Sequence, residues 1–182
     1  IFWEAWVDCH LNNGFQMIHE DRCYLHIRDG HGNFIQFCYH VDDNLIIARG
    51  WAFYQEYLAL FSTKFDYTEG ELDSHLGVAY HFHIKAGTCF IEQSAQTMKF
   101  LKSFGHENCK PASVPTMTGA PPSSAGCNEP CEEKWDMEGF IGHASYPHMC
   151  TRPDIGQVVK ILSRFTKNFG LRHVQYAKHL LC

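Results

Sequence analysis

Two adjacent aspartates, Asp42 and Asp43, are the residues of this sequence whose type and spacing most directly predict chemistry. They lie between two apolar runs, residues 34–39 and 45–48, which predict strands joined by a short turn. Two carboxylates about 5 Å apart repel each other by roughly 3 kcal/mol at an effective dielectric near 20, and a divalent cation turns this repulsion into attraction. Mg²⁺ prefers carboxylate and water ligands, and a pair of such ions supports phosphoryl transfer. An Asp-Asp-Asn run is also ordinary turn chemistry, so from these residues alone a purely structural turn is the alternative.

A second set of candidate ligands is soft and lies around a segment rich in Pro, Ser, Gly and Thr. Its members are Cys109, Cys127, Cys131, His143, His148 and Cys150. Cys127-x-x-x-Cys131 followed by His148-x-Cys150 could close a tetrahedral zinc site. The spacing is not that of a standard zinc motif, and with thirteen histidines accidental pairs are common. A small zinc-binding module is therefore one interpretation among three.

The composition predicts a globular protein. The chain has 182 residues, of which 45% are hydrophobic and 14% aromatic, enough to bury a sizeable core. It has no run of about 18 apolar residues, and its nine cysteines lack the regular spacing of a disulfide framework. We therefore expect reduced thiols, no membrane partner and an intracellular location, cytoplasmic or nuclear.

The charge is unevenly distributed. The net charge is -5, yet residues 151–182 contain six basic residues and one acidic residue. Within this segment Lys160, Arg164 and Lys167 fall opposite an apolar stripe at helical spacing, which is typical of a surface that meets phosphates. A solvated helix face is the structural alternative.

The elements that must position these residues predict an α+β fold. Strands are expected at residues 23–27, 34–39 and 45–48, and a further hairpin at 76–84 and 89–92. Helices are expected near the start of the chain, at 51–65 and at 94–104. Residues 106–134 are predicted as a linker, and residues 135–182 as helical, with a capping box at Thr151-Arg152-Pro153-Asp154 and a final helix at about 172–181.

Several segments, in order, carry a family resemblance. His40-Val41-Asp42-Asp43 is similar to a Tyr-Val-Asp-Asp signature, and Gly70-Glu71-Leu72 with Leu76-Gly77-Val78 is similar to Gly-Glu-Leu-x-x-x-Leu-Gly-Ile. The most specific segment is Cys150-Thr151-Arg152-Pro153-Asp154-Ile155. Together they resemble the reverse transcriptase of copia-type retrotransposons over essentially the whole chain.

The resemblance implies a fragment of an RNA-directed DNA polymerase. Residues 1–105 would form part of a palm-type antiparallel sheet with packed helices, and residues 135–182 a helical, thumb-like subdomain. Asp42 and Asp43 would be catalytic metal ligands for nucleotidyl transfer with two Mg²⁺ ions. The third aspartate of the family, which precedes this region, is absent, so we expect weak Mg²⁺ binding and no polymerase activity by the chain alone.

The resemblance also implies partners. These are an RNA/DNA template-primer duplex, a dNTP and the other regions of the polyprotein, within a virus-like particle for an intact element. The residues expected to meet nucleic acid are His40, Lys160, Arg164, Lys167, Arg172 and Lys178. His40 replaces the usual Tyr and Asn44 a usual apolar residue; His40 is interpreted as a tolerated replacement rather than a new base. A non-enzymatic descendant that binds nucleic acid or protein is the alternative function.

Overall fold

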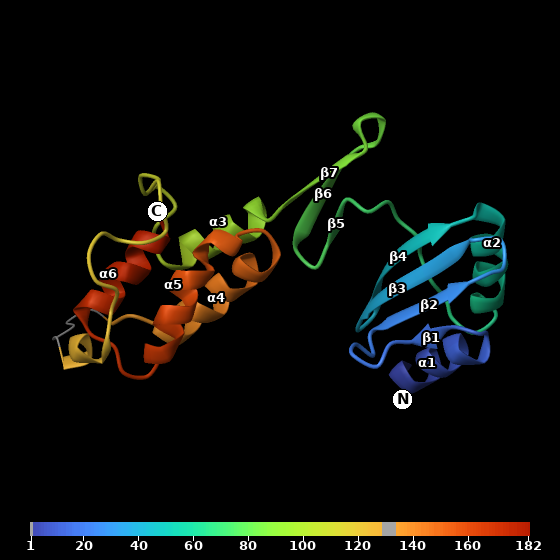
Figure 1. Cartoon of the computed structure of the whole chain (residues 1–182), viewed down its shortest axis with the longest axis horizontal. Coiled ribbons are helices and arrows are strands. Elements are labelled where there is room, and N and C mark those ends of the chain that lie inside the picture. The colour runs from blue at the N-terminus through green and yellow to red at the C-terminus, as the bar shows by residue number, and fades with distance from the viewer. Residues whose placement is uncertain (1, 129–133) are drawn as a thin grey trace. The chain divides into compact units, whose positions relative to one another are not determined.

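The chain divides at Glu71 into two units, residues 1–71 and 72–182, each with its own sheet and helices (Figure 1). This computed structural model describes residues 2–128 and 134–182. The α+β architecture expected from the sequence is present. Residues 72–105, which we grouped with the palm-like part, belong to the second unit.

Unit 1 is an antiparallel sheet with two helices. Helix α1 (Phe2–Asn12) is followed by β1 (Gln16–Met17), β2 (Tyr24–Arg28), β3 (Phe34–His40), β4 (Asp43–Arg49) and α2 (Trp51–Phe61). The strands pair in the order β1-β2-β3-β4. Gly14 ends the turn after α1 with φ 87°, a left-handed conformation that glycine adopts without a Cβ clash.

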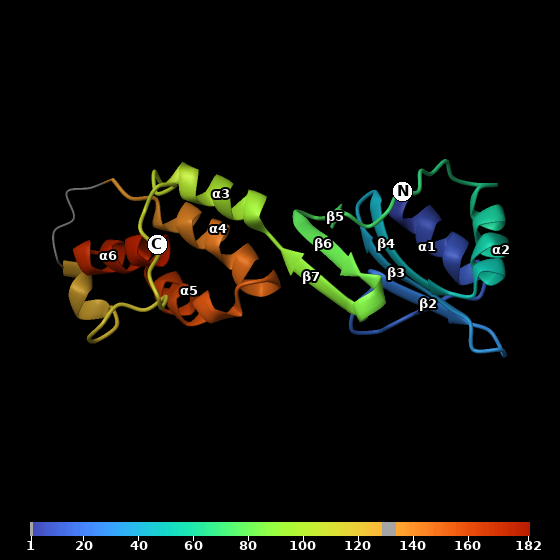
Figure 2. The same cartoon turned by 90° about the horizontal axis from the view of Figure 1, so that it is seen from above.

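The register of the strands divides the sheet into two faces. Leu25 lies opposite Phe37, and Phe37 lies opposite Ile46, so these side chains share a face. They belong to an aromatic-rich core that also contains Trp6 of α1 and Tyr57 of α2. The helices α1 and α2 therefore cover this inner face (Figure 2).

The other face of the sheet, here called the open face, carries the alternate residues. Within the described part of unit 1, no helix covers it. Its residues are Tyr24, His26, Arg28, Phe34, Gln36, Cys38, His40, Asp43, Leu45, Ile47 and Arg49. Ile47 is 52% exposed, so the open face presents apolar as well as polar groups to solvent.

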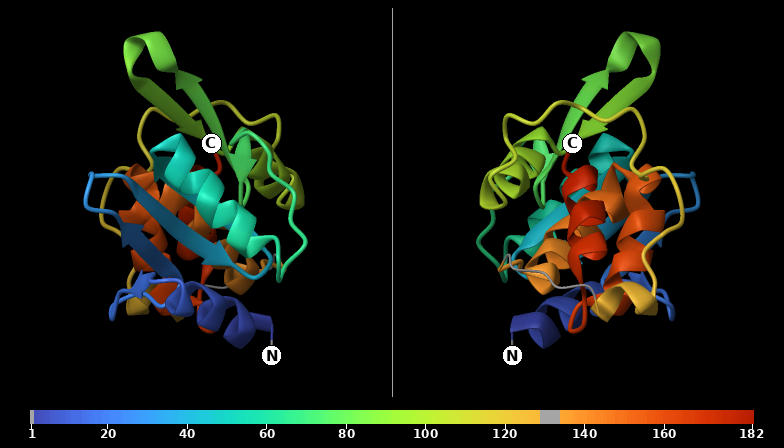
Figure 3. Two further views of the ribbon diagram at one scale, coloured as in Figure 1. Left: turned by 90° about the vertical axis from the view of Figure 1, so that its right-hand side faces the viewer. Right: turned by 90° about the vertical axis from the view of Figure 1, so that its left-hand side faces the viewer.

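Unit 2 begins with a second antiparallel sheet, β5 (Ser74–His75), β6 (Val78–His83) and β7 (Thr88–Glu92), with a 3₁₀ turn at Ile84–Ala86. The β6–β7 hairpin extends away from the helices of the same unit (Figure 3). This hairpin was predicted from the sequence and is confirmed. Leu76 and Gly77 form the two-residue turn between β5 and β6, with φ of 51° and 78°, the pattern of a type I′ turn.

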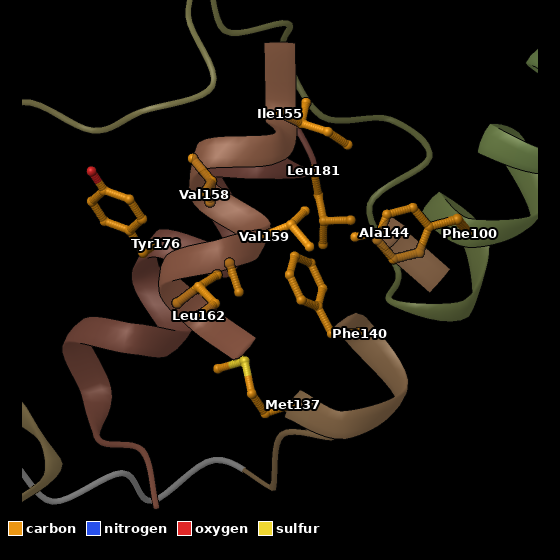
Figure 4. Close-up of a cluster of buried hydrophobic side chains, with 11 residues drawn as sticks. Phe100, Met137, Phe140, Ala144, Ile155, Val158, Val159, Leu162, Tyr176 and Leu181 are labelled. Atoms are coloured by element: carbon orange, nitrogen blue, oxygen red, sulfur yellow. The ribbon is translucent and has the colours of Figure 1, made fainter. Parts of the chain in front are cut away.

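The helices of unit 2 enclose a separate core. They are α3 (Ser94–Ser103), α4 (Met137–Cys150), α5 (Gly156–Leu162) and α6 (Leu171–Leu180), with 3₁₀ turns at Ser124–Asn128, Pro153–Ile155 and Ser163–Phe165. Phe100 and Phe140 meet Val159 and Leu181 in the middle of this core (Figure 4). The apolar stripe was predicted at Ile155, Val158, Val159, Leu162 and Phe165. The first four residues are buried, whereas Phe165 lies half-buried in the 3₁₀ turn after α5.

The predicted capping box at residues 151–154 is wrong. The Thr151 hydroxyl donates a hydrogen bond of 2.7 Å to Gln93 Oε1 instead of capping the helix. Asp154 accepts two hydrogen bonds from Arg152, at 2.9 and 2.8 Å. Neither Thr151 nor Asp154 therefore caps the helix, and the segment starts as a 3₁₀ turn without a side-chain cap.

Among the residues that the structure describes, no helix has the length and apolar character needed to cross a membrane.

Candidate functional site

The acidic pair lies at the tip of the β3–β4 hairpin, as predicted. His40 pairs with Asp43, so Val41 and Asp42 form a two-residue turn. Both aspartates and His40 are exposed. A short turn between paired strands holds the two carboxyl groups close together and in contact with solvent.

The turn itself is strained. Val41 has φ 56°, which is costly for a β-branched residue, whereas Asp42 is not in the left-handed region. Positive φ at the first turn residue alone is the pattern of a type II′ turn, where glycine is the usual residue. The left-handed conformation of Val41 therefore costs the hairpin about 1–2 kcal/mol, which the rest of the fold offsets.

The flanking residues point to opposite sides of the sheet. His40 and Asp43 are on the open face, whereas Tyr39 and Asn44 are on the inner face. Burial raises the pKa of the Tyr39 hydroxyl, and the negative charge of Asp42 contributes to the same shift. The open face beside Asp43 was not predicted from the sequence as part of the site, although the alternation of residues along β3 and β4 contains the signal.

The carboxylates of Asp42 and Asp43 are the type of ligand that Mg²⁺ binds, but two of them are too few for a complete site. Two carboxylates are hard oxygen ligands, as Mg²⁺ requires. Within residues 2–128 and 134–182, however, no group of three or more His, Cys, Asp or Glu side chains is placed to hold a metal ion. The magnesium site stays a prediction that needs further ligands.

The predicted nucleic-acid contacts of unit 2 fall into two groups. Lys160 on α5, Arg164 in the 3₁₀ turn after it and Lys167 are exposed, and Lys167 forms an ion pair with Glu138. Because both partners of that pair are largely exposed, the pair contributes little and leaves Lys167 available to phosphates.

Arg172 and Lys178 on α6 are half-buried and have partners within unit 2. Arg172 donates to the Ala120 carbonyl at 3.2 Å, and the Lys178 ammonium lies 5.7 Å from the centre of the Trp135 ring. These contacts orient both side chains along the surface of unit 2. The acidic pair belongs to unit 1 and all five of these cations to unit 2.

The candidate zinc ligands are not brought together in the described residues. The Cys127 thiol donates to the Asn168 carbonyl at 3.0 Å, and His148 and Cys150 lie on α4. Cys131 lies outside the described residues. No described group of ligands therefore supports the zinc-module interpretation.

The comparison with known proteins shows a similarity to a retrotransposon polyprotein. The chain matches no protein-family model, and no solved structure is similar to it. It is 28% identical over 169 residues to the retrovirus-related Pol polyprotein from transposon TNT 1-94 of Nicotiana tabacum. The match covers 90% of this chain but only 13% of that polyprotein.

This similarity supports an origin of the chain in a retrotransposon polyprotein. The expected retrotransposon origin is therefore confirmed at that level.

Proposed function

We propose that the chain is a segment of a reverse transcriptase that contains part of the palm and the helical region after it. Asp42 and Asp43 contribute two of the carboxylates that hold Mg²⁺ for nucleotidyl transfer. The observation that carries the proposal is the exposed acidic pair on a two-residue hairpin, beside a sheet face that no described helix of unit 1 covers. The similarity to a retrotransposon Pol polyprotein supports it.

The proposed site is incomplete, and the sheet offers a place for the rest. β4 is at the edge of its sheet, so in the described residues its outer backbone groups have no partner strand. A strand added there would bring its side chains beside Asp43. We therefore propose that another region of the polyprotein supplies a third carboxylate, and that the chain alone does not polymerise DNA.

The cations of unit 2 are proposed to contact the backbone of a template-primer duplex. Lys160, Arg164 and Lys167 are exposed on neighbouring turns of the chain. Three phosphate contacts give a slope of about -2.7 for the logarithm of affinity against the logarithm of salt concentration. His40, on the open face, is proposed to contact nucleic acid next to the acidic pair.

Primer extension tests the polymerase part. The chain is assayed with Mg²⁺, dTTP and poly(rA)/oligo(dT), alone and with the segment of the tobacco polyprotein that precedes the matched region. We expect no extension by the chain alone, and extension in the mixture that the Asp42→Asn, Asp43→Asn double variant abolishes. An Asp66→Asn, Glu71→Gln variant removes the same charge from exposed positions of unit 1 and should leave extension unchanged.

Extension that survives loss of the acidic pair would contradict the proposed role of Asp42 and Asp43. Extension by the chain alone would contradict the proposed incompleteness.

Fluorescence anisotropy with a labelled RNA/DNA duplex tests the binding part. A Lys160→Gln, Arg164→Gln variant should lower the salt slope by about 2 units. The matched control is Lys99→Gln, Lys102→Gln, which removes two exposed cations from α3 of the same unit. An equal loss of affinity and slope in both variants would mean that general charge, rather than this surface, binds the duplex.

One observation favours the alternative of a non-enzymatic binding protein. Residues 81–91 of the β6–β7 hairpin are all exposed, including Phe82, Ile84 and Phe90 at 55%, 89% and 61%. Exposed apolar groups of this size are typical of binding surfaces. A Phe82→Ser, Phe90→Ser variant that loses duplex binding while the Lys160 and Arg164 variant keeps it would favour this alternative.

A further inference from the structure

The segment after α3 runs alongside the C-terminal end of α6. Three contacts tie them together: the Cys109 thiol donates to the Leu181 carbonyl at 3.0 Å, the Ala112 N–H to the Cys182 carbonyl at 2.7 Å, and His179 Nε2 to the Val114 carbonyl at 3.0 Å. Figures 1 and 2 both show this part of the chain passing beside the C-terminal residue. The contacts hold two segments about 70 residues apart in a fixed alignment.

Each of the two aligned segments contains a cysteine. Cys109 and Cys182 are both free thiols and both half-buried. The Cys109 thiol lies 3.0 Å from the carbonyl oxygen of Leu181, the residue that precedes Cys182. The three contacts therefore hold the segments that carry the two cysteines next to each other.

We propose that Cys109 and Cys182 form a reversible disulfide when the chain meets a peroxide. The thiolate of one cysteine attacks a peroxide oxygen and breaks the O–O bond, which gives a sulfenic acid and, after proton transfer, one water. The other thiol attacks the sulfenic sulfur, forms the S–S bond and releases a second water. Two thiols and one hydrogen peroxide thus give one disulfide and two waters; the sulfurs are oxidised and the peroxide oxygens are reduced.

The disulfide would fasten the segment after α3 to the end of α6. The closed loop would contain α4, α5 and α6, and so most of the core of unit 2. Closing a loop of this length restricts the unfolded chain and should raise the Tm of unit 2 on the order of 10 °C. A reducing thiol reverses the change. The proposal does not depend on the function proposed above.

The environment of Cys182 sets the pH dependence of the reaction. Burial, and after it the neighbouring Cys109 thiol, raises the pKa of the Cys182 thiol. Because the thiolate is the reactive form, disulfide formation should become faster as the pH rises above neutrality.

Peptide mapping tests the link directly. Trypsin does not cleave at Lys110 because Pro111 follows, so Cys109 lies in the peptide 103–134 and Cys182 in the peptide 179–182. The full-length chain carries Cys127→Ser and Cys131→Ser, which leaves Cys109 as the single cysteine of its peptide. It is treated with hydrogen peroxide, alkylated with iodoacetamide and digested without reduction.

The expected product is peptide 103–134 linked to peptide 179–182, lost on treatment with dithiothreitol and absent from the Cys109→Ser variant. Calorimetry should show the rise in Tm in the parent and none in the Cys109→Ser and Cys182→Ser variants. Separate alkylation or oxidation of the two thiols, or linkage of Cys182 to other cysteines as often as to Cys109, would overturn the proposal.

Discussion

His10 of α1 should make the stability of unit 1 depend on pH. Its side chain is fully buried, with Nδ1 2.7 Å from the Trp6 carbonyl oxygen and Nε2 2.7 Å from the Tyr57 hydroxyl. A carbonyl only accepts, so Nδ1–H donates to it, and Nε2 accepts from Tyr57. This arrangement satisfies the neutral ring, and a second proton on Nε2 would displace the proton that Tyr57 donates.

Burial lowers the pKa of His10, against a smaller opposing effect of the hydrogen bond to Trp6. The unfolded chain binds a proton near pH 6.5, whereas the folded chain binds it only at lower pH. The stability that the neutral ring provides is therefore complete above pH 6.5 and is lost as the pH falls from 6.5 towards the folded pKa. Because a single proton is involved, the unfolding free energy changes by at most about 1.4 kcal/mol per pH unit.

The test is urea unfolding of the chain and its His10→Gln variant at pH 5, 6, 7 and 8. Both proteins carry Trp135→Phe, which leaves Trp3, Trp6 and Trp51, all in unit 1, as the fluorescent reporters. Glutamine can accept from Tyr57 but does not titrate. The difference in unfolding free energy between the two proteins cancels the contribution of the other twelve histidines.

We expect that difference to be constant between pH 7 and 8 and to shrink by up to about 1.4 kcal/mol per pH unit below pH 6.5. A difference that stays constant from pH 5 to 8 would refute the reasoning, because the buried ring would then bind its proton equally in both states.

Two substitutions in turns and strands should raise stability. Asn44 has its Oδ1 buried on the inner face, where the described residues provide no hydrogen-bond partner, so Asn44→Val should raise the unfolding free energy of unit 1 by about 1–2 kcal/mol, as measured by urea unfolding. Asn44→Ala, which removes the amide without filling its space, is the control, and a loss of stability with valine would contradict the prediction. Leu76 is left-handed in a type I′ turn, so Leu76→Asn should raise the Tm of unit 2 by a few degrees, whereas Leu76→Ala, which keeps the strain, should not. The Tyr146 hydroxyl donates to the Leu76 carbonyl, a backbone contact that both variants retain.

The strands and the acidic hairpin were predictable because their signals are local. The short apolar runs 34–39 and 45–48 predict both strands and, between them, the turn that carries Asp42 and Asp43. The helix predicted at 94–104 is present as Ser94–Ser103 for the same reason. Such patterns predict which segments pack against a core even when the residues that form the rest of that core are unknown.

The helix at Met137–Cys150 was not predicted individually, because its sequence favours other conformations. Gly139, Gly142 and Pro147 are poor helix formers, yet Met137 and Phe140 are buried against α5 and α6. Thr151 was misread for a related reason: its partner is Gln93, 58 positions earlier, which no local pattern reveals. In both cases a tertiary contact outweighed local propensity.

Local rules are also broken on both sides of the acidic pair. Val41 holds a conformation that favours glycine, and Asn44 places an amide oxygen in the core without a described partner. Each departure costs about 1–2 kcal/mol, and both lie within two residues of Asp42 and Asp43. Strain that the rest of a fold sustains at one point is typical of functional sites, and relieving it tends to raise stability at the expense of activity. The Val41→Gly variant should therefore be more stable than the parent chain, and in the primer-extension mixture it should extend more slowly. If it were more stable and equally active, the strain would have no role in positioning the carboxylates.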